Sequence, residues 1–147
     1  MLKRWAIIVG LSMTPALVAG QSAACAAGIG WEIDPWRLLP VIMISGFIEG
    51  MIVAWLAGAT SKLGFIERRF EKLRTPKAIA FTQKWGTWGG LILGVAVLGQ
   101  EPILVALRFL GVDVRKLWFP LLVSNALFAA IYYAVVKTGW DQLGNLF

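Results

Sequence analysis

The chain has 147 residues, of which 59% are hydrophobic, and its mean hydropathy is +0.73. A soluble domain is nearer half apolar, so this composition favours one compact membrane domain. The formal net charge is +6, histidine is missing, and Cys25 is the one cysteine. These counts exclude an intramolecular disulfide, the usual zinc and haem ligand sets, and a nucleophile paired with histidine within this chain. We therefore expect no enzymatic activity, no metal site and no cofactor.

Residues 1–27 have the pattern of a targeting segment. Lys3 and Arg4 form a basic start, a short apolar core follows, and small residues surround Cys25. The pattern predicts either a signal peptide, cleaved after a small-x-small site, or a retained signal-anchor helix. Lipid attachment at Cys25 is a third alternative, because Ser-Ala-Ala-Cys resembles a lipoprotein box. A single helical membrane domain, 28–147, is expected to follow, opening with a short polar connector over 28–37.

Residues 38–60 predict the first transmembrane helix, because their length suits a bilayer core about 30 Å thick. Gly46, Gly50 and Gly58 recur along one face of this helix, and such small residues let another helix approach closely. Glu49 lies beside this ridge and near mid-membrane, so it faces protein. It is either a carboxyl group that loads and releases a proton or a structural hydrogen-bonding group.

Residues 62–84 carry seven of the fourteen basic residues on an amphipathic pattern. This predicts a helix on the cytoplasmic surface of the membrane, facing anionic lipid. No aromatic-rich basic motif accompanies the cluster, so we expect no nucleic-acid partner.

Residues 86–110 form an apolar segment that is broken in the middle by Gly99-Gln100-Glu101-Pro102. Pro102 cannot continue a helical hydrogen-bond ladder, and Gly90 and Gly94 form another small ridge before the break. The segment is either one kinked crossing or a re-entrant hairpin with its tip at the break. The hairpin keeps Arg115 and Lys116 on the side of residues 62–84, and the count of basic residues favours it.

Residues 117–137 predict the last crossing, in which Asn125 is a polar residue able to bond across helices. A chain break with a ridge of small residues occurs twice along the sequence. This similarity is too weak to define an internal repeat.

Three further polar side chains are candidates for a site. Glu101 precedes Pro102 at a helix start, where a carboxylate either caps the helix or lines a site at a broken helix. Arg108 lies two turns further on and would pair with Glu49 or Glu101, grip a phosphate, or extend to the interface. Gln100 would complete a polar network with Asn125.

The stretch ERRFEKLRTPKAIAFTQKWG, the entry KWGTWGGLILGVAVLG, the half-helix PILVALRFLGVDVRK and the earlier GFIEGM resemble the small multidrug export protein family. That family is itself distantly similar to DedA-type (VTT) membrane proteins. The resemblance covers about residues 38–137. It implies acid and arginine residues in re-entrant helices and a role in export, lipid translocation or proton-coupled transport.

These observations predict an all-α integral protein of the cytoplasmic (inner) membrane, with the 62–84 loop in the cytoplasm. The expected function is proton-coupled transport of an amphiphilic or lipid-like substrate, with membrane lipids as partners and a homo-oligomer enclosing the pathway. The alternative is a non-catalytic accessory or assembly subunit of a membrane complex.

Overall fold

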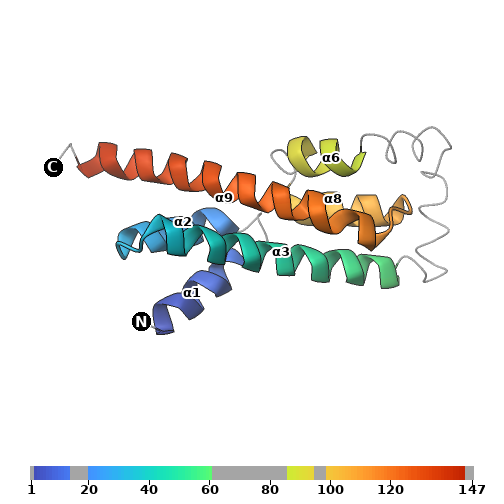
Figure 1. The fold of residues 1–147 in the computed structure, drawn as a ribbon, viewed down its shortest axis with the longest axis horizontal. Helices are drawn as coiled ribbons and strands as arrows, with labels where there is room; N and C mark the ends of the chain where they lie inside the picture. Colours follow the sequence, from blue (N-terminus) through green and yellow to red (C-terminus); the bar gives the residue numbers. More distant parts are fainter. Residues whose placement is uncertain (1, 14–19, 61–85, 95–98, 145–147) are drawn as a thin grey trace. The chain divides into compact units, whose positions relative to one another are not determined.

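The computed structural model describes residues 2–13, 20–60, 86–94 and 99–144, and every regular element in these ranges is a helix (Figure 1). The predicted all-helical class is therefore confirmed for this part of the chain. The amphipathic helix predicted over 62–84 lies outside the described residues. In chain order the elements are α1 (Leu2–Ser12), α2 (Gly20–Gly30), α3 (Pro35–Thr60), α6 (Thr87–Gly89), the π-helix η3 (Gly90–Gly94), α8 (Gln100–Phe109) and α9 (Val114–Gly144).

Two of these helices are long and apolar enough to cross a membrane. They are Pro35–Thr60 and Val114–Gln142, with mean hydropathies of 1.9 and 1.8 over their most apolar windows. Only 33% of each window is buried, which differs from the core helix of a soluble protein. Ile44, Ile48 and Ile52 are exposed at intervals of four residues, so α3 carries an uncovered apolar face.

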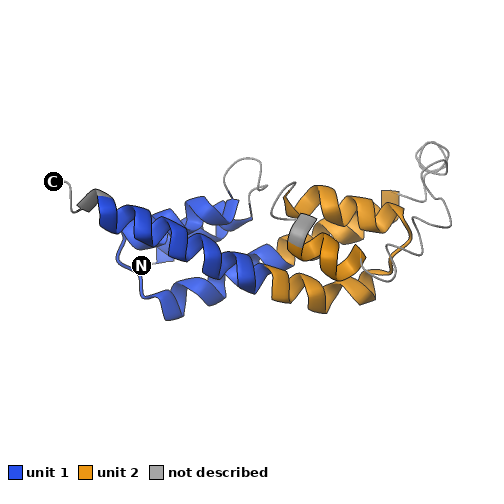
Figure 2. Cartoon of the chain, turned by 90° about the horizontal axis from the view of Figure 1, so that it is seen from above, with its two compact units in different colours: residues 1–47, 125–147 blue, residues 48–124 orange. Residues whose placement is uncertain are grey.

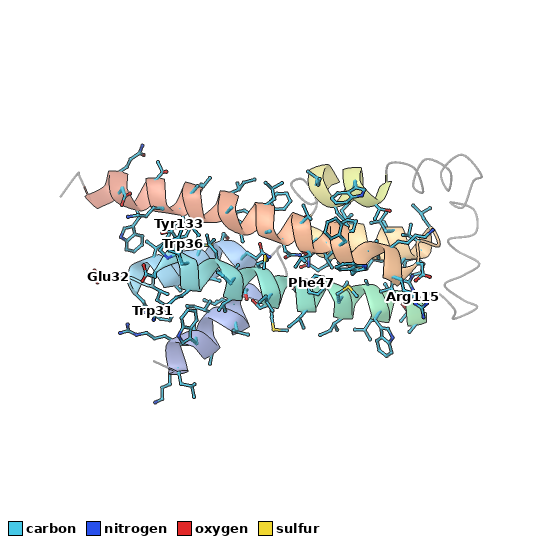
Figure 3. All side chains as sticks on the ribbon, viewed as in Figure 1. Trp31, Glu32, Trp36, Phe47, Arg115 and Tyr133 are labelled. Carbon is cyan, nitrogen blue, oxygen red and sulfur yellow. The ribbon has the colours of Figure 1, made fainter. Side chains whose placement is uncertain are left out.

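The connector predicted over 28–37 is wrong in its limits, because α2 continues to Gly30 and α3 begins at Pro35. The backbone N–H of Ile33 donates to Gly28 and that of Glu32 to Ile29, which is the hydrogen-bond pattern that closes a helix end. Proline suits the first position of α3, where no N–H donor is needed. Figure 3 shows Trp31, Glu32 and Trp36 gathered at this turn.

The predicted interruption of the 86–110 segment is confirmed at Gly99. This residue has a φ of 83° and a ψ of 168°, a backbone conformation that only glycine adopts readily. Helix α8 begins at the next residue, Gln100, so Pro102 lies in its first turn, where a missing N–H costs nothing.

The chain forms two compact units, coloured separately in Figure 2. Unit 1 consists of Met1–Phe47 and Asn125–Phe147, and unit 2 consists of Ile48–Ser124. The core of unit 1 joins α1 and α2 to the ends of the two long helices through Ile8, Ala24, Cys25, Leu38, Ile42 and Ala129. In unit 2 the fully buried side chains include Ala54, Leu91, Leu104, Leu117 and Leu121.

The two units repeat one another at a constant spacing of 79 positions, which the sequence alone was too divergent to reveal. Helices α3 and α9 begin at Pro35 and Val114, 79 positions apart. All four described residues with positive φ form pairs at that spacing: Gly20 with Gly99, and Glu32 with Gly111. Buried residues also correspond, as Cys25, Leu38 and Ile42 are followed 79 positions later by Leu104, Leu117 and Leu121, all 0% exposed.

Backbone hydrogen bonds at the helix ends recur with the same spacing. In unit 1, N–H groups of Trp31, Glu32, Ile33 and Arg37 donate to Ala27, Ile29, Gly28 and Asp34. In unit 2, N–H groups of Leu110, Gly111, Val112 and Lys116 donate to Ala106, Arg108, Leu107 and Asp113. The same hydrogen-bond pattern at each of these positions indicates an internal duplication, which the breaks and small-residue ridges of the sequence were too weak to define.

Candidate functional site

The carboxyl groups of Glu49 and Glu101 meet in unit 2. Glu49 projects from α3 and Glu101 from the first turn of α8, and their carboxyl groups are close enough to interact with each other. Both side chains are half-buried. A hydrogen bond between two carboxyl groups needs a proton on one of them, because an ionised carboxylate only accepts. The site is therefore suited to hold a proton between two acids.

Gln100 anchors the start of α8 beside this acid pair. Its side chain is 7% exposed and lies on Gly50, where a Cβ atom would come within 2.5 Å of Nε2. The glycine therefore provides the space that the glutamine occupies. Because Gly50 follows Glu49 on α3 and Gln100 precedes Glu101 on α8, this packing also brings the two acids together.

Arg108 does not join the two acids. Its Nε donates to the carbonyl of Ala54 at 3.0 Å and its Nη1 to the carbonyl of Val112. The guanidinium lies directly on Gly58, where any Cβ atom would overlap it. Nine residues of helix separate Glu49 from Gly58, about 13 Å along the axis. Arg108 thus fastens the end of α8 to α3, and among the described residues no carboxylate forms an ion pair with it.

Asn125 belongs to unit 1, where it is 1% exposed. Gln21 of α2 donates a hydrogen bond from Nε2 to Asn125 Oδ1 at 2.6 Å. Both amide groups lie on Gly46, where a Cβ atom would overlap Gln21 Nε2 and Asn125 Oδ1. Gln100 belongs to unit 2 and Asn125 to unit 1, so each is described within its own unit, and the network of the two stays a prediction.

The remaining glycines proposed for helix packing have different surroundings. A Cβ atom at Gly90 would make ordinary contacts with Ile103 at 3.5 Å and Leu107 at 3.9 Å, so η3 packs on α8 there. Gly94 is the last residue of η3, and its surroundings lie outside the described part of the structure.

Sequence reasoning missed Gln21, because it falls in the segment with the pattern of a targeting signal. The signal that would have found it is the dipeptide Gly20-Gln21, which recurs as Gly99-Gln100 at the spacing of the duplication. In both units the glutamine follows a glycine of positive φ and lies on a glycine of α3.

No group of three or more potential metal ligands occurs among the residues that the structure describes. No family model matches the chain, and neither a curated protein nor a solved structure matches it.

Proposed function

We propose that this chain is a small integral protein of the cytoplasmic membrane that couples movement of a proton to transport of an amphiphilic or lipid-like substrate. The observation that carries the proposal is the close pair of carboxyl groups of Glu49 and Glu101, inside a unit built of apolar helices. Acidic residues are rare within membrane helices, and where they occur they mark ion and proton pathways.

The duplication supports a functional origin for these charges. The positions of unit 1 that correspond to Glu49 and Glu101 are Phe128 and Ser22, both uncharged. A fold that needed these acids only for its stability would need them in both units. Both acids lie in unit 2, as expected of a site added to a duplicated scaffold.

Loss of the shared proton supplies a driving force for rearrangement. Two neighbouring carboxylates repel each other strongly in surroundings of low dielectric constant. Glu101 lies two residues after the break at Gly99, so repulsion acts on the start of α8. Deprotonation would then favour a conformation in which α8 moves away from α3 and the packing of Gln100 on Gly50 is weakened. The result is a shift of the conformational equilibrium.

The orientation of α3 in the membrane is proposed from the basic residues between 62 and 84, which favour the cytoplasmic side. The end of α3 that precedes them would then lie on that side. The two candidate crossings among the described residues are too few to enclose a substrate pathway, so we propose a homo-oligomer in contact with membrane lipids.

The test is proton-coupled transport by purified protein in lipid vesicles. An imposed pH gradient should drive movement of a lipophilic fluorescent cation, ethidium, across vesicles containing the unaltered chain. Glu49→Gln and Glu101→Gln should each abolish this movement while leaving insertion intact, because an amide keeps one hydrogen bond to the remaining acid. Glu32→Gln, at an exposed turn, is the matched control and should retain transport.

Transport at the unaltered rate by both glutamine variants of the pair would contradict the proposal. An accessory subunit would be favoured instead if the unaltered chain moved no ethidium and if the two glutamine variants failed to assemble into a larger complex in cells.

A further inference from the structure

Helices α1 and α2 are built into the core of unit 1. Ile8 of α1 and Ala24 and Cys25 of α2 are 0% exposed and pack with Leu38 and Ile42 of α3. A segment that is removed after targeting has no need of such contacts. Cleavage near Cys25 would uncover these side chains of α3.

Two contacts fix where α1 begins and ends along α3. The guanidinium of Arg4 lies 5.8 Å from the ring centroid of Trp31, so α1 begins beside the turn that precedes α3. At the other end of α1 the hydroxyl of Ser12 is hydrogen-bonded to that of Ser45. Ser45 comes ten residues after the start of α3, which is about 15 Å along the helix axis. This distance is half the thickness of a bilayer core.

Helix α2 returns from that depth to the same turn. Gln21, at its start, lies on Gly46 and is bonded to Asn125, whereas Gly30, at its end, leads into the turn before α3. Each of α1 and α2 has 11 residues, which span about 16 Å. Neither helix crosses a bilayer by itself, and together they run half-way in and back.

The second repeat contains the corresponding contact. The hydroxyl of Ser124 donates to the backbone carbonyl of Leu91 at 2.5 Å, and these residues are 79 positions after Ser45 and Ser12. The helix that precedes the break therefore meets the following long helix at the same depth in both units.

We infer that α1 and α2 stay in the mature protein as a re-entrant helix pair, the first of two duplicated pairs, with Gln21 held against Asn125. This pair enters from the side of the membrane on which α3 begins. The inference uses the membrane assignment of α3 and does not depend on transport.

The first test is the intact mass of the full chain, carrying a C-terminal tag and extracted from membranes. We expect a mass that includes Lys3 to Ala27. A mass that shows cleavage within the small-residue run at 22–27, with the preceding residues removed, would overturn the inference.

The second test distinguishes a re-entrant pair from a crossing signal-anchor. In a Cys25→Ser chain, single cysteines replace Lys3 or Trp36, both exposed, and intact cells are treated with a membrane-impermeant thiol reagent. Trp36 lies at the start of α3 and is labelled in Figure 3. We expect positions 3 and 36 to react alike, either both before or both only after the membrane is opened.

Labelling of position 3 from the side opposite to position 36 would show a crossing helix and overturn the inference. Each variant is first compared with the unaltered chain by gel filtration in detergent.

A third test examines the bond that ties the first pair to α9. Gln21→Ala and Asn125→Ala should each lower the midpoint of thermal unfolding, and the double variant should fall no further than the more affected single one. Additive shifts would contradict the pairing.

Discussion

Gly50 lies directly beneath the side-chain amide of Gln100. A methyl group at this position would come within 2.5 Å of Gln100 Nε2 and 3.0 Å of a methyl of Leu121, distances that require a neighbour to move. The absence of a side chain on α3 is thus what admits the first residue of α8, and with it the adjacent acid Glu101.

Gly50→Ala should therefore destabilise the protein by about 1–3 kcal/mol, the usual effect of overpacking, and reduce transport. The measurement is thermal unfolding in detergent. Gly89→Ala is the matched control, because a Cβ atom there meets nothing within 4 Å. Alanine favours a helix over glycine by about 1 kcal/mol, so the control should be neutral or slightly stabilising. Equal losses in both variants would refute this role of Gly50.

The contributions of Arg108 and Gly58 to stability should be coupled. Arg108→Ala removes two hydrogen bonds to backbone carbonyls, and Gly58→Ala displaces the same guanidinium. We expect each variant to lose about 1–3 kcal/mol, and the double variant to lose little more than one of them, a coupling of at least about 0.5 kcal/mol. Simple addition of the two losses in a double-mutant cycle would show that the arginine does not depend on the glycine.

Ser45 and Ser124 should have similar importance, because they hold corresponding helices at corresponding positions. Replacing either by alanine removes a buried hydrogen bond, with an expected loss of about 1 kcal/mol of unfolding free energy. Thr138→Ala is the control, since this exposed hydroxyl bonds only within its own helix, and the loss should stay below about 0.5 kcal/mol. A neutral Ser124→Ala variant would argue against the contact with Leu91.

The long helices and the break at Gly99 were predictable because each has a local cause. Apolar runs of membrane-spanning length make α3 and α9, and a glycine followed by a proline three residues later interrupts the segment before α8. The approach of Glu101 to Glu49 was only one of several pairings that the sequence allowed, because it depends on which glycine of α3 receives Gln100.

The first helix pair was not predictable from composition. A basic start, a short apolar stretch and small residues suit a signal peptide as well as two half-length helices. The contacts that distinguish them, Ser12 with Ser45 and Arg4 with Trp31, join residues far apart in the sequence. The partners of Arg108 were missed for a related reason, because they are backbone carbonyls and leave no pattern of side chains.

The central claim is that Glu49 and Glu101 share a proton. Infrared spectroscopy of the purified protein in lipid at neutral pH tests it most directly, through the carbonyl stretch of a protonated carboxylic acid. We predict a band in the unaltered protein that is lost or shifted in Glu49→Gln and Glu101→Gln and unchanged in Glu32→Gln. A spectrum without this band, or a band that both variants of the pair retain unaltered, would contradict the account.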